Sequence, residues 1–218
     1  MSLVWRTFLR MQIGKDIRKL EFSGTKIYIM DNIRDVSMDE VMRLQEMLPA
    51  WRREKALAIK NDNVRRESVL SFALLMEALE DEYRISDGLD VIYAEHGKPL
   101  LANYPGLHFN LSHCRDAVAC AVGRRNMGVD IERCGRYKER LARHVLNERE
   151  LQKVMNSDDA DMVFTVLWTQ KEAYLKMTGT GLGGNMKDVL SGQVQCKIAT
   201  VDSKNYVCSV AVEENGPV

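Results

Sequence analysis

Helical and strand-like patterns alternate along this chain in two comparable blocks, one running to about Pro105 and the other beginning at Gly106. Each block offers one or two helices and a few strands, and no Pro/Ser-rich linker separates them. This organisation predicts an α+β fold of two halves, residues 1–105 and 106–218. The two halves are expected to share a broad interface, and a site between them is geometrically natural.

Local signals place the individual elements. Capping boxes begin at Ser37 and Asn147, and each predicts the start of a helix. Apolar spacing predicts a long helix over residues 62–83 and a buried helix that reaches Met177, while residues 51–60 form a basic helical piece. The expected strands are 26–30, 90–94, 108–112, 117–122, 127–131, 193–200 and 206–212.

Composition narrows the class of protein. The chain has 218 residues, and its 45% hydrophobic and 28% charged content is ordinary for a globular protein. Lys plus Arg and Asp plus Glu number 31 each, which argues against a protein that coats nucleic acid or an acidic membrane surface. Because there is no apolar run of roughly 20 residues and no cleavable leader pattern, a cytoplasmic location is expected.

The five cysteines are odd in number and lack Cys-x-x-Cys spacing. They are therefore expected to be reduced thiols and not a disulfide framework. A zinc site would have to use His113, Cys114, Cys120 and Cys134, whose intervals match no common structural-zinc pattern.

Two acidic clusters predict a metal and phosphate site. Asp130 and Glu132 stand two residues apart among β-branched residues, so on a strand both carboxylates project from one face. Glu172 and Lys176 are four residues apart, which on a helix places a carboxylate and an ammonium one turn apart. Three carboxylates with a nearby lysine suit Mg²⁺ shared with a diphosphate, although each motif alone is common as a solvated surface pair.

A wider set of motifs resembles a known family. The motifs are Gly-Lys-Pro at 97–99, Phe-Asn-Leu-Ser-His at 109–113, Gly-Val-Asp-Ile-Glu at 128–132, Trp-Thr-Gln-Lys-Glu-Ala-Tyr-Leu-Lys at 168–176 and Gly-Thr-Gly-Leu at 179–182. In their order and spacing the chain resembles the larger, two-half class of 4'-phosphopantetheinyl transferases, the surfactin-synthetase-activating type. That resemblance implies two similar halves in a pseudo-twofold arrangement, each a small, mainly antiparallel sheet packed with helices, with the active site between them.

The resemblance also implies a role for each matching residue. Asp130, Glu132 and Glu172 are expected to hold Mg²⁺, and Glu172 and Lys176 to be catalytic. The expected contacts to coenzyme A come from Arg52, Lys55, Lys98, Ser112, His113 and Lys176. One departure is Cys114, where family members usually carry a small hydroxyl residue.

The reaction implied by the resemblance uses coenzyme A as co-substrate. A serine hydroxyl of an apo acyl or peptidyl carrier protein attacks the β-phosphorus, which transfers phosphopantetheine and releases adenosine 3',5'-bisphosphate. Fatty-acid, polyketide and peptide-synthetase carriers remain equally open. Neither nucleic acid nor membrane is an expected partner, and a monomer is the simpler expectation.

Two rival functions use the same residues. A Mg²⁺-dependent phosphodiesterase or nuclease would employ the acidic trio, but the neutral net charge weighs against a nucleic-acid substrate. A non-catalytic module that binds coenzyme A or a carrier protein is the other alternative. The presence of all four residues Asp130, Glu132, Glu172 and Lys176 weighs against it, because a protein that only binds has no need of them. The glycine-rich run from Gly179 follows a helix and does not link a strand to a helix, so it is no dinucleotide fingerprint.

Overall fold

The structure is a computed structural model, and it describes residues 16–181, 185–192 and 194–214. The strands are β1 (Ile17–Phe22), β2 (Thr25–Asp31), β3 (Val91–Tyr93), β4 (Pro99–Leu101), β5 (His108–His113), β6 (Ala117–Gly123), β7 (Met127–Arg133), β8 (Cys196–Asp202) and β9 (Tyr206–Glu213). The helices are the short 3₁₀ turn η1 (Ile33–Asp35), α2 (Met38–Met47), α3 (Ala50–Leu57), α4 (Asp62–Tyr83), α5 (Glu139–Val145), α6 (Glu148–Met155) and α7 (Ala160–Thr178).

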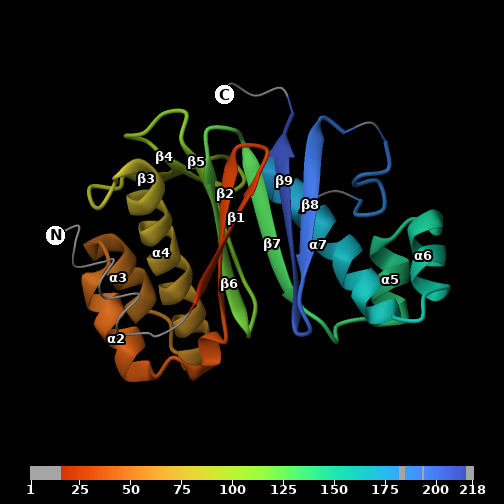
Figure 1. The fold of residues 1–218 in the computed structure, drawn as a ribbon, viewed down its shortest axis with the longest axis horizontal. Coiled ribbons are helices and arrows are strands. Elements are labelled where there is room, and N and C mark those ends of the chain that lie inside the picture. The colour runs from red at the N-terminus through yellow and green to blue at the C-terminus, as the bar shows by residue number, and fades with distance from the viewer. Residues whose placement is uncertain (1–15, 182–184, 193, 215–218) are drawn as a thin grey trace.

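Two antiparallel sheets lie face to face between two long helices (Figure 1). The first sheet has the strand order β1-β2-β6-β5, the second has the order β7-β9-β8, and β3 pairs with β4 in a separate hairpin. Helix α4 packs on the outer face of the first sheet, and α7 packs on the outer face of the second. The layers therefore follow the order helix, sheet, sheet, helix.

Period-two alternation along the strands builds this layering. In β2, Tyr28 and Met30 pack toward α4, whereas Ile27 and Ile29 pack against the second sheet. In β9, Val210 faces the first sheet and its neighbour Ala211 faces α7. Strands buried on both faces carry near-continuous apolar sequence, as residues 117–123 of β6 do.

The capping boxes predicted at Ser37 and Asn147 are confirmed. The Ser37 hydroxyl accepts from the Glu40 backbone nitrogen, while the Glu40 carboxylate accepts from the Ser37 nitrogen. Asn147 and Glu150 make the same reciprocal pair at the start of α6. Helix α4 spans residues 62–83 as its apolar spacing predicts, and Asn61 caps it.

The fold class is confirmed: the chain is α+β, with antiparallel sheets packed against helices. Four elements of the described residues were not predicted, namely β1, η1, β4 and α5. The division at residue 105 stays a prediction as a domain boundary. The chain passes from the first sheet to the second between β6 and β7 and not at residue 105. Strands β5 and β6 follow residue 105, yet they belong to the first sheet. Position 193, where the predicted strand 193–200 begins, lies outside the described residues.

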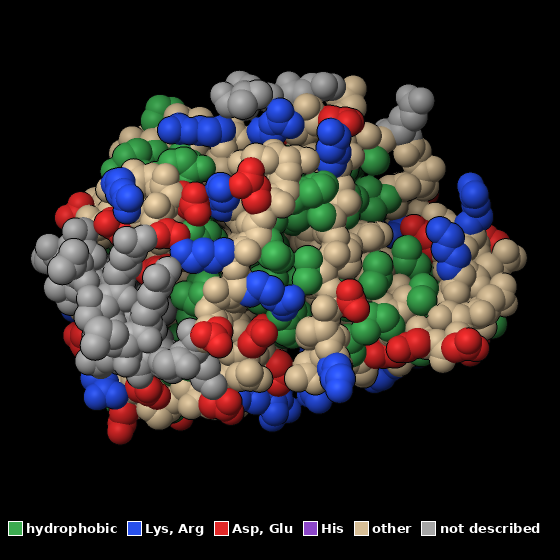
Figure 2. All heavy atoms as spheres, viewed as in Figure 1, with side chains coloured by type: hydrophobic (Ala, Val, Ile, Leu, Met, Phe, Trp, Pro, Cys, Tyr) green, Lys and Arg blue, Asp and Glu red, His purple; other side chains and the backbone are tan. Residues whose placement is uncertain are grey.

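Charged side chains of both signs are distributed over the surface. On the face shown in Figure 2, Lys and Arg side chains are interspersed with Asp and Glu. Within the described ranges, none of the helices has the length and apolar character needed to cross a membrane.

Candidate active site

The site lies where β5 of the first sheet runs beside β7 of the second, and side chains join these two strands. Asn110 accepts a hydrogen bond through Oδ1 from the Val129 backbone nitrogen at 2.9 Å. Two residues further along, the Ser112 hydroxyl accepts from the Ile131 nitrogen at 3.2 Å. The motif at residues 109–113 therefore connects the sheets through its alternate residues.

Asp130 and Lys176 form the centre of the site. The Lys176 ammonium on α7 lies 2.7 Å from Asp130 Oδ1 and 2.9 Å from the Ser112 hydroxyl. Ser112 in turn donates to Asp130 Oδ1 at 2.9 Å. The Asp130 side chain is 6% exposed and that of Lys176 is 30% exposed, so the carboxylate is buried while the ammonium reaches the surface of the site.

A pocket of about 330 Å³ opens over this centre. Its lining includes the three predicted metal ligands together with Lys176, and it is completed by Leu111, Ser112, His113 and Trp168. The pKa of Glu172 is raised above its ordinary value because the carboxyl is desolvated and because the charges of Asp130 and Glu132 repel it; Lys176 partly offsets this. The three carboxylates predicted as metal ligands thus line one pocket, and their role as ligands stays a prediction.

The carboxylates are not gathered around one point. Glu132 accepts from Arg136 Nη1 at 2.5 Å, and Asp130 is held by Lys176. Among residues 16–181, 185–192 and 194–214, no group of three His, Cys, Asp or Glu side chains is arranged to hold a metal ion. The donor set nevertheless fits a hard cation, because Asp130 Oδ2 is buried with no hydrogen-bond partner and the charges of Asp130 and Glu132 repel that of Glu172.

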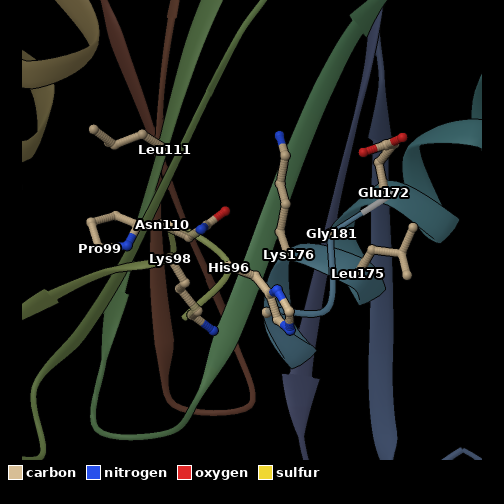
Figure 3. Close-up of a pocket in the computed structure, with 11 residues that line it drawn as sticks. His96, Lys98, Pro99, Asn110, Leu111, Glu172, Leu175, Lys176 and Gly181 are labelled. Carbon is tan, nitrogen blue, oxygen red and sulfur yellow. The ribbon is translucent and has the colours of Figure 1, made fainter. Parts of the chain in front are cut away.

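A second pocket, of about 190 Å³, adjoins the first (Figure 3). Glu172 and Leu175 of α7 lie on one side, Asn110 and Leu111 of β5 lie on the other, and Lys176 extends between them. Glu172 and Lys176 line both pockets. The turn that carries His96 and Lys98 closes one end.

Lys98 joins that turn to the second sheet and its helix. Its ammonium donates to the Met127 and Met177 carbonyl oxygens at 3.2 and 2.6 Å, and also to the Asn126 side-chain oxygen. Burial lowers the pKa of Lys98 to about 8. The predicted contact of Lys98 with a coenzyme A phosphate stays a prediction, and it would have to compete with these three acceptors.

The two residues of α3 that were predicted to bind coenzyme A differ in how accessible they are. Arg52 donates to the Ser68 carbonyl and hydroxyl oxygens at 2.9 and 2.7 Å, and burial lowers its pKa. Lys55 is exposed, and its ammonium lies 2.8 Å from the Tyr93 hydroxyl. Of the two, Lys55 is therefore the more available to an incoming phosphate.

Sequence reasoning missed three supporting residues. Glu67 of α4 lies 3.1 Å from His113 Nδ1, which fixes the imidazole at the pocket. Asn110 was included in a motif but given no role. Lys171 is fully buried and pairs with Glu150 at 3.0 Å, so it secures α7 to α6 instead of reaching the pocket. No spacing signal could have found Glu67, because it is 46 residues from its partner.

Comparisons with known proteins agree with the motifs. Residues 126–211 match the model of the 4'-phosphopantetheinyl transferase superfamily. The chain is 27% identical over 197 residues to the 4'-phosphopantetheinyl transferase Sfp of Bacillus subtilis, covering 86% of this chain and 88% of that protein. It is 28% identical to the 4'-phosphopantetheinyl transferase ffp of Bacillus subtilis, over 72% and 71% of the two chains.

A further relative is similar over a shorter region. The 4'-phosphopantetheinyl transferase HetI of a Nostoc species is 39% identical over 98 residues, or 41% of each chain. Among solved structures, the holo-[acyl-carrier-protein] synthase of Thermotoga maritima overlaps with a TM-score of 0.35 at 21% identity, covering 41% of this chain and 64% of that one.

Proposed function

Because this chain belongs to the 4'-phosphopantetheinyl transferase superfamily, we propose that it transfers the 4'-phosphopantetheine group from coenzyme A to a serine of an apo acyl or peptidyl carrier protein. Adenosine 3',5'-bisphosphate is the leaving product. The observation that carries this proposal is that Asp130, Glu132, Glu172 and Lys176 line one pocket. An acidic trio beside one ammonium is the combination that a diphosphate and a hard cation require.

Asp130, Glu132 and Glu172 are the residues that would hold Mg²⁺. Bound there, the ion neutralises charge on the diphosphate of coenzyme A. The unpartnered Asp130 Oδ2 supports this role, because it offers an oxygen acceptor to a cation. The raised pKa of Glu172, which desolvation and the charges of Asp130 and Glu132 cause, supports it as well, because a cation would offset that repulsion. For Glu132 to contribute, its contact with Arg136 must give way.

Lys176 stabilises the charge that develops on the leaving phosphate. Its partly exposed ammonium is held in place by Asp130 and Ser112, so little reorganisation is needed when a phosphate enters. His113 lies on the same pocket and supplies a further donor to a phosphate oxygen. Lys55 and Arg52 are the candidates for the 3'-phosphate end of the nucleotide.

Glu172 accepts the proton of the carrier serine, directly or through a water molecule. A raised pKa makes a carboxylate a stronger base, and this suits Glu172 to the role. The serine oxygen forms a bond to the β-phosphorus while the bond to the leaving phosphate breaks. No covalent enzyme intermediate is involved.

The proposed partners are coenzyme A and a small acidic carrier domain. The equal numbers of basic and acidic residues, 31 each, support the expectation that neither nucleic acid nor an anionic membrane is a partner. We propose that the enzyme acts in the cytoplasm as a monomer.

The direct test is to incubate the purified protein with an apo acyl carrier protein, coenzyme A and Mg²⁺ and to measure the intact mass of the carrier. We expect the carrier to gain one phosphopantetheine group, and EDTA to abolish the gain. Measurable coenzyme A binding with no gain on several carriers would favour a binding module. Hydrolysis of the diphosphate without transfer would favour the phosphodiesterase alternative.

A further inference from the structure

Arg136 is held beside the acidic pocket by the loop that carries it. This loop, residues 134–138, leads from the end of β7 to the start of α5. The carboxylate of Asp161, in the first turn of α7, accepts from the Tyr137 backbone nitrogen at 2.8 Å and also from the Gly135 backbone nitrogen. Arg136 lies between these two bound positions, so α7 fixes the backbone from which its side chain extends.

The guanidinium of Arg136 is in contact with one of the three carboxylates. Its Nη1 donates to Glu132 Oε1 at 2.5 Å, and its central carbon lies 6.0 Å from the centre of the Trp168 ring. The Glu132 side chain is 20% exposed, so the arginine neutralises a carboxylate that is largely buried. Glu132 and Trp168 line both the pocket of about 330 Å³ and a small neighbouring hollow, and the lining of the hollow includes Arg136. The arginine therefore approaches Glu132 from the hollow, while the carboxylate also faces the pocket.

The charge of Arg136 also acts on a second carboxylate of the pocket. Desolvation and the charges of Asp130 and Glu132 raise the pKa of Glu172, whereas the charges of Lys176 and Arg136 lower it. Arg136 is thus a cation beside the same acidic residues that would hold a metal ion. Its positive charge takes part of the place that a divalent ion would fill electrostatically.

We propose that Arg136 competes with the divalent cation for Glu132 and thereby sets the affinity of the free enzyme for that cation. This inference deepens the proposed function and rests on it for the assignment of Glu132 as a metal ligand. An ion pair with a half-exposed arginine contributes little to stability, so Glu132 can exchange the guanidinium for the ion at small cost. Trp168 offers the released guanidinium a second contact, because an arginine is attracted to the face of an indole ring.

The consequence concerns the order in which ligands enter. Arg136 keeps Glu132 neutralised in the free enzyme and so weakens binding of the cation alone. Mg²⁺ shares its ligand shell with substrate phosphates, and a diphosphate that supplies oxygen ligands would offset this competition. Arg136 therefore favours entry of the cation together with coenzyme A.

The test measures binding of Mn²⁺ alone to the protein by electron paramagnetic resonance, since Mn²⁺ takes the same oxygen ligands as Mg²⁺. Arg136→Gln should bind Mn²⁺ about three- to tenfold more tightly, because it removes both the competing contact and a nearby positive charge. The matched control is Arg143→Gln. Arg143 makes an ion pair of the same spacing with Glu139 on α5, at 2.6 Å, and its loss should leave Mn²⁺ affinity unchanged.

A double variant separates the contact from the charge. In a Glu132→Gln background the contact is already lost, so adding Arg136→Gln should change Mn²⁺ affinity by less than about twofold. An equal gain in both backgrounds would overturn the proposal, because Arg136 would then act only through its charge. Weaker Mn²⁺ binding by Arg136→Gln would also overturn it, since the arginine would then orient Glu132 for the ion. Unchanged affinity, or no Mn²⁺ binding by the wild-type protein and Arg136→Gln, has the same consequence.

NMR provides a direct view of the exchange. The Nε–H signal of Arg136, identified by its loss in Arg136→Gln, should shift when Mg²⁺ is added, whereas that of Arg143 should not. The carrier-mass measurement tests the proposed function separately. If the wild-type protein transfers nothing but Arg136→Gln tightens Mn²⁺ binding, the proposed function fails and the competition stands. An active enzyme whose Mn²⁺ affinity does not depend on Arg136 would overturn the competition alone.

Discussion

A Cβ atom placed on Gly128 would lie 2.1 Å from the carbonyl oxygen of Ala173 and 2.4 Å from the Met177 backbone nitrogen. Strand β7 and helix α7 therefore touch backbone to backbone at this glycine. The contact lies two residues before Asp130 and includes the backbone carbonyl carbon of Lys176 at 2.8 Å, so it sets how closely the carboxylate and the ammonium approach. Gly128 is required here for space, since nothing larger than hydrogen fits between the two backbones.

Gly128→Ala should therefore separate α7 from β7. We expect the free energy of unfolding to fall by about 3 kcal/mol or more, at the upper end of overpacking costs, because rigid backbone and not a flexible side chain must move. Urea denaturation measures this loss. Gly192→Ala is the control, since a Cβ there meets no atom within 4 Å and should change stability little. A tolerated Gly128→Ala would show that the helix can withdraw at little cost.

Local signals predicted much of this fold because their causes are local. The capping box at Ser37 and the apolar face of α4 depend on residues within a few positions of one another. By contrast, β1 lies at a half-buried sheet edge and its charged and apolar residues do not alternate regularly, and β4 is only three residues long. Both acquire their structure by pairing with another strand, which no local pattern reports.

In the site, too, local features could be predicted from the sequence and tertiary contacts could not. Spacing alone indicated that Asp130 and Glu132 share a face and that Glu172 and Lys176 are one helical turn apart. Which partners occupy these groups depends on tertiary contacts. The Ser112 hydroxyl makes three hydrogen bonds, and Lys98 donates to carbonyl oxygens of β7 and α7. Both residues could be assigned to a phosphate only by resemblance, because a sequence does not show which hydrogen bonds a side chain already makes in the folded protein.

Glu172→Gln should separate binding from chemistry. The amide keeps the size of the side chain but cannot accept the serine proton, so turnover should fall by about 100-fold or more. Coenzyme A binding, measured by calorimetry, should be partly retained. Glu148→Gln, an exposed glutamate at the start of α6, is the control and should turn over normally. A nearly wild-type rate for Glu172→Gln would exclude it as the base.

Lys55→Met should weaken binding of coenzyme A but not of coenzyme A that lacks its 3'-phosphate. The exposed Lys55 ammonium supplies a charge-assisted bond, whose loss should raise the dissociation constant about tenfold. Calorimetry with the two ligands makes the comparison. Arg53→Met, a neighbouring cation that pairs with Glu46, should affect neither ligand. Equal weakening for both ligands would place Lys55 away from the 3'-phosphate.

Lys98 should make stability depend on pH in the alkaline range. Its pKa is about 8 in the folded protein, against an ordinary value of 10.5 for a lysine. Between these values the unfolded chain binds more protons than the folded one, so the free energy of unfolding rises with pH. The cost of burying the ammonium is fully present below pH 8 and is relieved as the pH increases. Three oxygen acceptors limit the effect, so the gain from pH 7 to pH 9 should be at most about 1 kcal/mol.

A comparison of the wild-type protein with Lys98→Met isolates this group, because the cysteines titrate alike in both proteins. The variant loses the three hydrogen bonds at every pH, and it lacks the alkaline gain. Urea denaturation at pH 7, 8 and 9 should therefore show the wild-type advantage widening as the pH rises. An advantage that stays constant would mean that Lys98 keeps its proton throughout, held by the Met127 and Met177 carbonyl oxygens. An advantage that narrows would contradict the direction of the pKa shift.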